Sequence, residues 1–350
     1  MIQAEARIYF QEKNIDYMKI YPDNSVILAP LAGFTDLPYR RSARRHGCLF
    51  AFTEMIDAGS LVFGHGKTLA MLKRGENETW LGVQIVGSEH EILKKATRII
   101  SQHDVNVIDF NLGCPARKVI KKGEGAALAK KTEEAIRAFE VIVRNSQMPV
   151  TVKTRIIDEE DPAPTIDLVK KLVDAGAAAV TLHGRIMTKV YSGDVKFKII
   201  AEVRKNVKTQ LIANGGIFSS STCESLRRET GCDCVMVARG AMGNPWIFRE
   251  IAEGKSFNPP TPEDLAGEIG FHVAEMAELC GEEIGVRISR KIMIDYARGR
   301  GYPGELRNSV CKIKTLEEMK PFLDNVRIGP TPRYSKWIEA NPDAPRRLQV

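Results

Sequence analysis

The chain has 350 residues, 43% hydrophobic and 27% charged, with a formal net charge of +7 at pH 7. At ~150 residues per domain this length predicts two domains, and the composition is that of a globular protein that buries a full core. No stretch approaches the ~20 apolar residues of a membrane span or forms a signal-peptide core, so we expect a cytoplasmic protein. The charge is compatible with a polyanionic partner without proving one.

Seven cysteines, an odd number without the spacing of a disulfide framework, predict reduced thiols. Cys232 and Cys234, with Cys223 nearby, raise two interpretations, a metal site or core packing. No second pair or suitably spaced histidine accompanies them, and Cys234 opens an apolar strand. We therefore favour packing and expect no metal.

Short apolar runs bounded by turn residues predict eight β-strands, separated by stretches of helical periodicity. The strands are Val26–Ala29, Phe50–Glu54, Leu81–Val86, Val107–Asn111, Val150–Arg155, Ala179–His183, Leu211–Asn214 and Val235–Arg239. The clearest helices are Ser88–Gln102, Thr132–Arg144, Thr165–Ala175, Phe197–Lys205 and Ser221–Thr230. Several of these helices begin on a Ser or Thr suited to capping the first turn.

Strands that alternate with helices predict a parallel sheet covered on both faces. Eight such units in about 230 residues fit an α/β fold of the TIM (β/α)8 barrel type, followed by a smaller C-terminal α-helical domain. A doubly wound sheet is the alternative. Its usual glycine fingerprint after the first strand is absent from the turn at residues 30–36.

A polar or small residue stands at or just past the end of each strand, and in a barrel these ends converge on the rim that carries active sites. They are Ala29, Glu54, Gln84, Asn111, Lys153, His183, Asn214 and Arg239. The longest gap between them, 42 residues from Asn111 to Lys153, contains Cys114 and the basic, glycine-rich segment 121–128. That segment is suited to close over an anionic substrate.

Cys114 is a single thiol at the start of a loop that follows a buried strand. This placement suits a proton donor better than a disulfide. Gly113 and Pro115 on either side favour a turn and an exposed thiol. The alternative is a small buried side chain of the core, the commonest role of a free cysteine.

Lys153 and Arg155, two residues apart on one strand, point to the same face, and two cations in a barrel interior require an anion. Reduced flavin is one such anion, and a nearby positive charge stabilises its anionic form. The alternative is an ion network with Glu54 or Asp109.

Glycines follow the seventh strand at Gly215 and Gly216 and the eighth at Gly240, where the backbone of this barrel class commonly approaches a phosphate. Arg239 adds a charge-assisted donor. These features predict a mononucleotide such as FMN with its phosphate at strands seven and eight and its ring over Lys153.

Several motifs, in matching order, make the chain resemble the FMN-dependent tRNA-dihydrouridine synthases of bacterial type over almost its whole length. They are residues 28–36, 111–115, 150–155, 182–185, 212–216 and 243–246. The resemblance implies a flavin held by Pro30, Leu31, Ala32, Gln84, Lys153, His183, Asn214, Gly215, Gly216, Ala238 and Arg239. Ala238 stands where the family commonly has glycine. An alanine is compatible with a backbone contact to the phosphate at this position if its φ is negative.

The resemblance further implies reduction of the uracil C5=C6 bond in tRNA, with NADPH or NADH reducing the flavin. Hydride would pass from flavin N5 to C6, and Cys114 would protonate C5, as a thiol protonated at neutral pH can. Asn111 suits the uracil edge because its amide both donates and accepts. Arg155 and Arg185 are the other candidate substrate contacts near the barrel mouth.

After the barrel, residues 258–262 read as a linker into a helix capped by Thr261 with Pro262 at its first position. Leu265, Ile269 and Val273 then recur at helical spacing. The predicted domains are an N-terminal extension (1–24), the FMN-binding barrel (25–255), a helical tRNA-binding domain (256–325) and a tail (326–350). We expect a monomer.

The segment from residue 287 to 314 is strongly basic, with Arg287, Arg290 and Lys291 on one predicted helical face and Tyr296 and Tyr302 interspersed. A basic stripe with aromatics suits RNA phosphates and stacking on unpaired bases. The resemblance implies that this domain grips tRNA. The alternative is a solvated surface paired with the acidic helix before it.

Two other functions stay open. A flavin barrel that reduces an enone or oxidises dihydroorotate would share Lys153 and the phosphate turns without needing the basic helices. A non-catalytic RNA-binding barrel would lack flavin.

Overall fold

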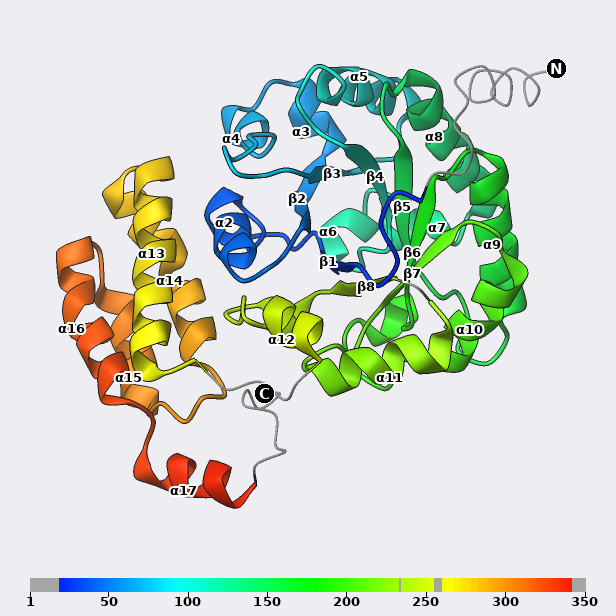
Figure 1. Ribbon diagram of the computed structural model, residues 1–350. Helices are drawn as coiled ribbons and strands as arrows, with labels where there is room; N and C mark the ends of the chain where they lie inside the picture. The colour runs from blue at the N-terminus through cyan, green and yellow to red at the C-terminus, as the bar shows by residue number, and fades with distance from the viewer. Residues whose placement is uncertain (1–18, 233, 255–259, 342–350) are drawn as a thin grey trace. The chain divides into compact units, whose positions relative to one another are not determined.

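A computed structural model describes residues 19–232, 234–254 and 260–341, and it contains a closed barrel of eight parallel strands in the order β1 to β8 (Figure 1). The strands are β1 (Val26–Leu28), β2 (Phe50–Asp57), β3 (Leu81–Val86), β4 (Val107–Leu112), β5 (Val150–Arg155), β6 (Ala179–His183), β7 (Gln210–Asn214) and β8 (Cys234–Val237). The barrel is confirmed, and the doubly wound alternative is excluded because β1 pairs with both β2 and β8.

Contacts divide the chain into two compact units. The first comprises residues 1–33, 49–217 and 222–238, and the second comprises 34–48, 218–221 and 239–350. The second unit thus joins two segments from the barrel part of the sequence to the C-terminal helices. The predicted boundary at residue 255 stays a prediction of the sequence alone.

Several helices accompany the barrel strands, and of these α5, α8, α9 and α10 form much of the layer outside the strands (Figure 1). Their bounds are α3 (Ala58–Val62), α4 (Gly66–Ala70), α5 (His90–Ile100), α6 (Arg117–Ile120), α7 (Ala126–Ala129), α8 (Thr132–Asn145), α9 (Ala163–Asp174), η1 (Met187–Lys189), α10 (Phe197–Asn206) and α11 (Ser220–Thr230). The expected Ser or Thr caps are absent from α5, α8 and α9, whose N-caps are Glu89, Lys131 and Pro162 without a side-chain hydrogen bond. Burial of the apolar face stabilises these helices in place of capping.

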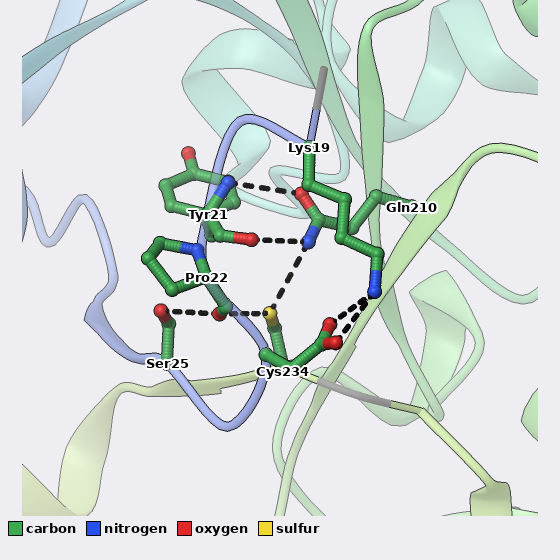
Figure 2. Close-up of polar contacts among 7 residues, drawn as sticks. Lys19, Tyr21, Pro22, Ser25, Gln210 and Cys234 are labelled. Atoms are coloured by element: carbon green, nitrogen blue, oxygen red, sulfur yellow. Dashed lines mark hydrogen bonds and ion pairs between the residues drawn. The ribbon is translucent and has the colours of Figure 1, made fainter. Parts of the chain in front are cut away.

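Residues 19–25 lie at the N-terminal ends of the strands, where Tyr21 is buried (Figure 2). The side-chain oxygen of Gln210 accepts from the Tyr21 amide over 3.1 Å, and its nitrogen donates to the Tyr21 carbonyl over 2.7 Å. The Tyr21 ring meets Phe50 edge-on at 5.3 Å and Trp80 at 5.4 Å. No role was predicted for residues 1–24. Those that the structure describes, from residue 19 on, fill one end of the barrel, and residues 1–18 lie outside the described part.

The second unit is helical, and its buried residues form a core of their own. Its elements are α2 (Leu37–Arg45), η2 (Arg239–Ala241), α12 (Ile247–Glu253), α13 (Pro262–Cys280), α14 (Glu282–Ala297), α15 (Gly304–Ser309), η3 (Val310–Lys312), α16 (Leu316–Ile328) and α17 (Pro332–Ala340). Thr261 caps α13 with a full capping box and Pro262 at the first turn, as predicted. Leu265, Ile269 and Val273 lie in the core, which confirms their helical spacing.

Several boundaries depart from the sequence predictions. β8 ends at Val237, and Arg239 begins the short helix η2 instead of completing the strand. The tail contains the end of α16 and all of α17 up to Ala340, although it has no clear pattern in the sequence. Part of the predicted linker, residues 258 and 259, lies outside the described ranges. No helix in the described residues is long and apolar enough to cross a membrane.

Candidate active site at the C-terminal ends of the strands

Strand register brings polar residues together inside the barrel. Gln84 on β3 pairs with Asp109 on β4, Asp109 pairs with Thr151 on β5, and Asn111 pairs with Lys153. Because side chains alternate along a strand, Asn111 and Lys153 lie one layer nearer the C-terminal rim than Asp109 and Thr151. All these residues belong to the first unit.

Asn111 holds the start of the Cys114 loop. Its Oδ1 accepts from the backbone amide of Gly113 over 3.0 Å and from that of Cys114 over 2.9 Å. Its Nδ2 donates to Oε1 of Gln84 over 2.7 Å. The amide oxygen is therefore engaged by the protein, while Nδ2 carries a second hydrogen.

Cys114 is half-buried, between the two states that the sequence left open. Its carbonyl accepts from the amide of Ala126 over 3.1 Å, so the loop returns upon itself. Gly125 has φ +57°, and a Cβ there would lie 2.9 Å from the Cys114 carbonyl oxygen. This glycine is required because the segment after Cys114 packs directly on the cysteine.

The basic segment after Cys114 is fixed at one point to the end of β2. Nζ of Lys122 lies 2.6 Å from Oδ2 of Asp57, and the pair is partly exposed. Although burial opposes it, hydrogen bonds from Lys122 and Ser60 hold the pKa of Asp57 below its usual value. Glu124 is buried, its Oε2 has no hydrogen-bond partner among the residues that the structure describes, and burial raises its pKa.

No carboxylate in the described part of the chain forms an ion pair with Lys153. Within the described residues its Nζ donates to Oδ1 of Asn214 over 3.0 Å, and Nδ2 of Asn214 donates to the Met236 carbonyl over 2.7 Å. Burial lowers the pKa of Lys153 to about 8, the neighbouring Arg155 acts in the same direction, and Asp109 opposes both. Lys153 therefore forms no ion pair with Glu54 or Asp109, the alternative that the sequence left open.

Arg155 holds loops. Its Nε donates to the Gly113 carbonyl over 2.7 Å, and one terminal nitrogen donates to the Val190 carbonyl over 2.8 Å. Val190 has φ +50°, which is strained for a β-branched residue. The guanidinium also lies 5.8 Å from the ring centroid of Tyr191. Arg155 therefore links the Cys114 loop to the loop after β6.

His183 packs against the glycines that follow β7. A Cβ on Gly215, whose φ is +123°, would lie 2.9 Å from Cδ2 of His183. The sequence assigned this glycine to a phosphate; the imidazole ring already requires it. Gly216 has φ +73°, so two successive glycines hold a turn that other residues would strain. Arg185 donates to the Gly193 carbonyl over 2.9 Å, and its other end lies 3.4 Å from His183 Nε2.

The remaining predicted flavin contacts lie at strand ends. Pro30 and Leu31 are half-buried and Ala32 is exposed in the loop after β1, which is held by a hydrogen bond from the Gly33 amide to Glu54. Ala238 ends the first unit, and Arg239 belongs to the second, where its guanidinium lies 5.7 Å from the Phe218 ring centroid.

A small cavity of about 70 Å³ lies beside the rim. Apolar side chains from the ends of β4, β5 and β6 and from α7 line most of it, with Arg155 and Lys130 as its cations.

The basic residues of the second unit have different surroundings. Arg287 is exposed and lies 3.3 Å from Glu283, whereas Arg290 donates twice to the Ile313 carbonyl, over 2.8 and 2.7 Å. Nζ of Lys291 lies 5.0 Å from the Phe34 ring centroid. These three cations therefore do not form one uniform stripe.

The prediction that Tyr296 and Tyr302 stack on bases is wrong. Tyr296 is fully buried, and Tyr302 is buried with its hydroxyl donating to the Val326 carbonyl over 3.0 Å. Both belong to the core of the helical unit. Arg300 is buried as well and donates to Oδ1 of Asn244 over 2.9 Å. Cys223, Cys232 and Cys234 are likewise buried, which fits core packing.

Sequence reasoning missed Thr151 and gave Asp109 only the part of an ion-pair partner. The available signal was their alternation with Asn111 and Lys153 along neighbouring strands. Their pairing depends on the register of β4 and β5, which no local pattern reveals.

The barrel carries a desolvated lysine and a cysteine loop at its C-terminal rim, where β/α-barrel enzymes have their active sites. These features place the protein in the class of β/α-barrel enzymes. Comparison with known proteins narrows it: residues 27–328 match the family model described as "Dihydrouridine synthase (Dus)". The chain belongs to the dihydrouridine synthase family.

Curated relatives match along most of the chain. The tRNA-dihydrouridine synthase B of Xanthomonas axonopodis pv. citri is 33% identical over 320 residues, which cover 89% of this chain and 96% of that protein. The protein of the same name from Vibrio vulnificus is 33% identical over 312 residues, which cover 87% of this chain and 97% of that protein. A solved nitroalkane oxidase from Streptomyces ansochromogenes is 16% identical over 71% of each chain, with a TM-score of 0.41.

Proposed function

We propose that this protein reduces the C5=C6 bond of uridines in tRNA to 5,6-dihydrouridine, using FMN that NADPH or NADH reduces. The family membership supports the reaction class. The observation that carries the chemistry is the Cys114 thiol, half-buried on a loop that Asn111 anchors beside the desolvated Lys153.

The residues at the rim fit FMN. Lys153 offers an ammonium group whose charge is poorly compensated, as a site for an anionic ring requires. Gly215 and Gly216, both at positive φ, form the turn after β7, where the backbone of this barrel class commonly approaches a phosphate. Gln84, His183 and Asn214 would complete the holding set with Pro30, Leu31 and Ala32. The parts assigned to Ala238 and Arg239 rest on the sequence resemblance.

FMN, when bound and reduced, supplies hydride to C6 of the uracil ring. Cys114 donates the proton that C5 then requires, so that hydrogen is added across the double bond and the thiolate regains its proton from solvent. Asn111 orients the uracil edge through its remaining Nδ2 hydrogen. Arg155 and Arg185 hold the surrounding loops, and Arg155 brings a positive charge to the side of Tyr191.

In the second unit, exposed cations are proposed to contact tRNA phosphates. Arg287, Lys312 and Lys314 are exposed, while Arg290 is committed to the Ile313 carbonyl. We therefore expect Arg287 to contribute to RNA affinity directly, and Arg290 and Lys291 to contribute through the shape of the surface. The salt dependence of binding should fall by about one unit of slope per phosphate contact removed.

The test is incubation of the purified protein with unmodified tRNA, FMN and NADPH, followed by mass spectrometric mapping of dihydrouridine. Arg287→Glu should weaken tRNA binding while NADPH oxidation by the flavin persists, and Lys170→Glu on the exposed face of α9 is the matched control. Reduction of small enones or oxidation of dihydroorotate, without any action on tRNA, would contradict the proposal. So would a purified protein that binds tRNA but no flavin.

A further inference from the structure

A continuous chain of buried hydrogen bonds runs from the middle of the barrel to the Cys114 loop. Asp109 Oδ1 accepts from the Thr151 hydroxyl over 2.7 Å, and its Oδ2 accepts from Nε2 of Gln84 over 2.7 Å. Oε1 of Gln84 accepts from Nδ2 of Asn111, whose Oδ1 accepts from the loop amides. The side chains of Gln84, Asp109, Thr151 and Asn111 are all buried.

The direction of this chain is fixed at both ends. The backbone amides of Gly113 and Cys114 can only donate, so Asn111 must turn its oxygen to the loop and its nitrogen to Gln84. An ionised carboxylate can only accept, so Gln84 must turn its nitrogen to Asp109 and its oxygen to Asn111. The two requirements agree. Reversal of either amide would place two donors or two acceptors face to face in a buried site.

We propose that Asp109 is a positioning residue, which acts through Gln84 and Asn111 to hold the Cys114 loop in the orientation seen here. The side chain of Asp109 lies one layer below the rim, so its effect on the loop passes through the two amides. This role rests on the proposed function in one respect, namely that Cys114 on this loop is the acid.

The surroundings of Asp109 tolerate a neutral carboxyl as well. Lys153 of β5 and Tyr21 of the N-terminal segment are the titratable groups that act on it, and Gln84 and Thr151 are its hydrogen-bond donors. Burial raises the pKa of Asp109 to about 6. A proton on Oδ1 can be donated to Thr151, because a hydroxyl also accepts. Thr151 therefore preserves the direction of the chain when Asp109 is neutral.

This logic predicts a reciprocal rescue. Gln84→Glu places a second carboxyl group against Asp109. At alkaline pH, where both groups are ionised, two acceptors face each other and the chain is broken. Adding Asp109→Asn restores it, because the new amide donates to residue 84 and accepts from Thr151, while residue 84 still accepts from Asn111. Asp109→Asn alone also preserves the chain. The single Gln84→Glu variant and the double variant share residue 84, so any difference between them reports residue 109 and not a change in flavin contact.

The test uses the full-length protein as purified, at alkaline pH so that both carboxyl groups are ionised, and measures two properties of the loop without RNA. One is the rate at which iodoacetamide alkylates Cys114, located by peptide mass, with exposed Cys311 as the internal reference. The other is hydrogen exchange of the peptide covering residues 112–116. Gln84→Glu should raise both rates about ten-fold, the effect expected when one buried hydrogen bond is lost, and the double variant should return toward the native rates.

Native rates in Gln84→Glu, or a double variant no slower than Gln84→Glu, would overturn the proposal. If Gln84→Glu does not fold, folding of the double variant counts as the rescue. If neither folds, Asp109→Ala should loosen the loop as strongly, and native rates in that variant would refute the inference. These readouts are independent of dihydrouridine formation, so a loop that relaxes as expected would leave the inference standing even if Cys114 proved not to be the acid.

Discussion

Nζ of Lys153 donates to Oδ1 of Asn214 over 3.0 Å inside the barrel, joining β5 to the end of β7. Asn214 also donates to the Met236 carbonyl, so it is itself held in place. The lysine is thus presented by a fixed neutral partner rather than neutralised by a carboxylate. This arrangement leaves its charge available to a bound anion.

Lys153→Met should lower the affinity for FMN by about 10- to 100-fold, the effect of losing a charged hydrogen-bond donor. Because the pKa of Lys153 is lowered to about 8, FMN affinity of the native protein should fall as the pH rises above this value, and that of the variant should not. Titration of flavin fluorescence between pH 7 and 10 measures both. Lys170→Met is the control, and an unchanged affinity in Lys153→Met would show that the ring lies elsewhere.

Asp109→Asn should change the pH dependence of stability. The pKa of Asp109 is raised to about 6, so the folded protein binds this proton more tightly than the unfolded chain does. The carboxyl therefore reduces the free energy of unfolding as the pH rises from about 4 to 6, by up to about 3 kcal/mol. Urea denaturation at pH 4.5 and 7.5 measures how much free energy of unfolding is lost when the pH is raised. This loss should be smaller in Asp109→Asn than in the native protein, and equal losses would contradict the raised pKa.

Glu268 joins α2 to α13 and α14 in the second unit. It accepts from Ser42 over 2.8 Å and lies 3.0 Å from Nε2 of His46, while Ser42 also lies 3.0 Å from the Tyr296 hydroxyl. Glu268→Ala should cost about 3 kcal/mol, because buried partners lose a carboxylate. Glu283→Ala, which removes an exposed partner of Arg287, should cost less than about 1 kcal/mol. Thermal unfolding compares the two.

The pH dependence of this site has the opposite sign to that of Asp109. Although burial opposes it, hydrogen bonds from His46 and Ser42 lower the pKa of Glu268. Its contribution to stability is complete above the unfolded pKa of about 4.3 and is lost as the pH falls through the folded value. A Glu268→Ala penalty that did not shrink on acidification would contradict this interpretation.

Gly243→Ala should be among the most damaging single substitutions in the second unit. The residue has φ +60°, and a Cβ would lie 2.4 Å from the backbone carbon of Asp295 in α14. We expect a loss of about 3 kcal/mol or more, since backbone strain and a backbone clash add. Gly254→Ala has a similar φ of +64° and no described atom within 4 Å of its Cβ, so it should cost only about 1 kcal/mol. Equal penalties would refute the packing explanation.

The barrel was predictable because each strand is a short apolar run between turn signals, and three strands, β3, β5 and β6, agree with their predicted bounds. Rim residues followed from the strand ends. What local patterns cannot supply is lateral pairing: nothing near Asp109 in the sequence points to Gln84 or Thr151, which lie 25 and 42 residues away. Gly215 shows the same limit, because the ring that needs it comes from His183.

The basic region shows how composition misleads. A run of cations and tyrosines reads as one surface, but the helical period divides it between solvent and core. Tyr296 and Tyr302 are buried, and Arg290 caps a carbonyl instead of facing solvent. Burial in α14 depends on its packing against α13, where a Cβ on Gly285 would lie 2.5 Å from the Met276 carbonyl oxygen.

The role of Cys114 is tested most directly by measuring dihydrouridine in tRNA after incubation with NADPH and either native protein or Cys114→Ala. Cys311→Ala, which removes an exposed cysteine of the second unit, is the matched control. Loss of a general acid should slow dihydrouridine formation by about 100-fold or more, while NADPH still reduces the flavin at the native rate. Dihydrouridine formed by Cys114→Ala at the native rate would contradict the account.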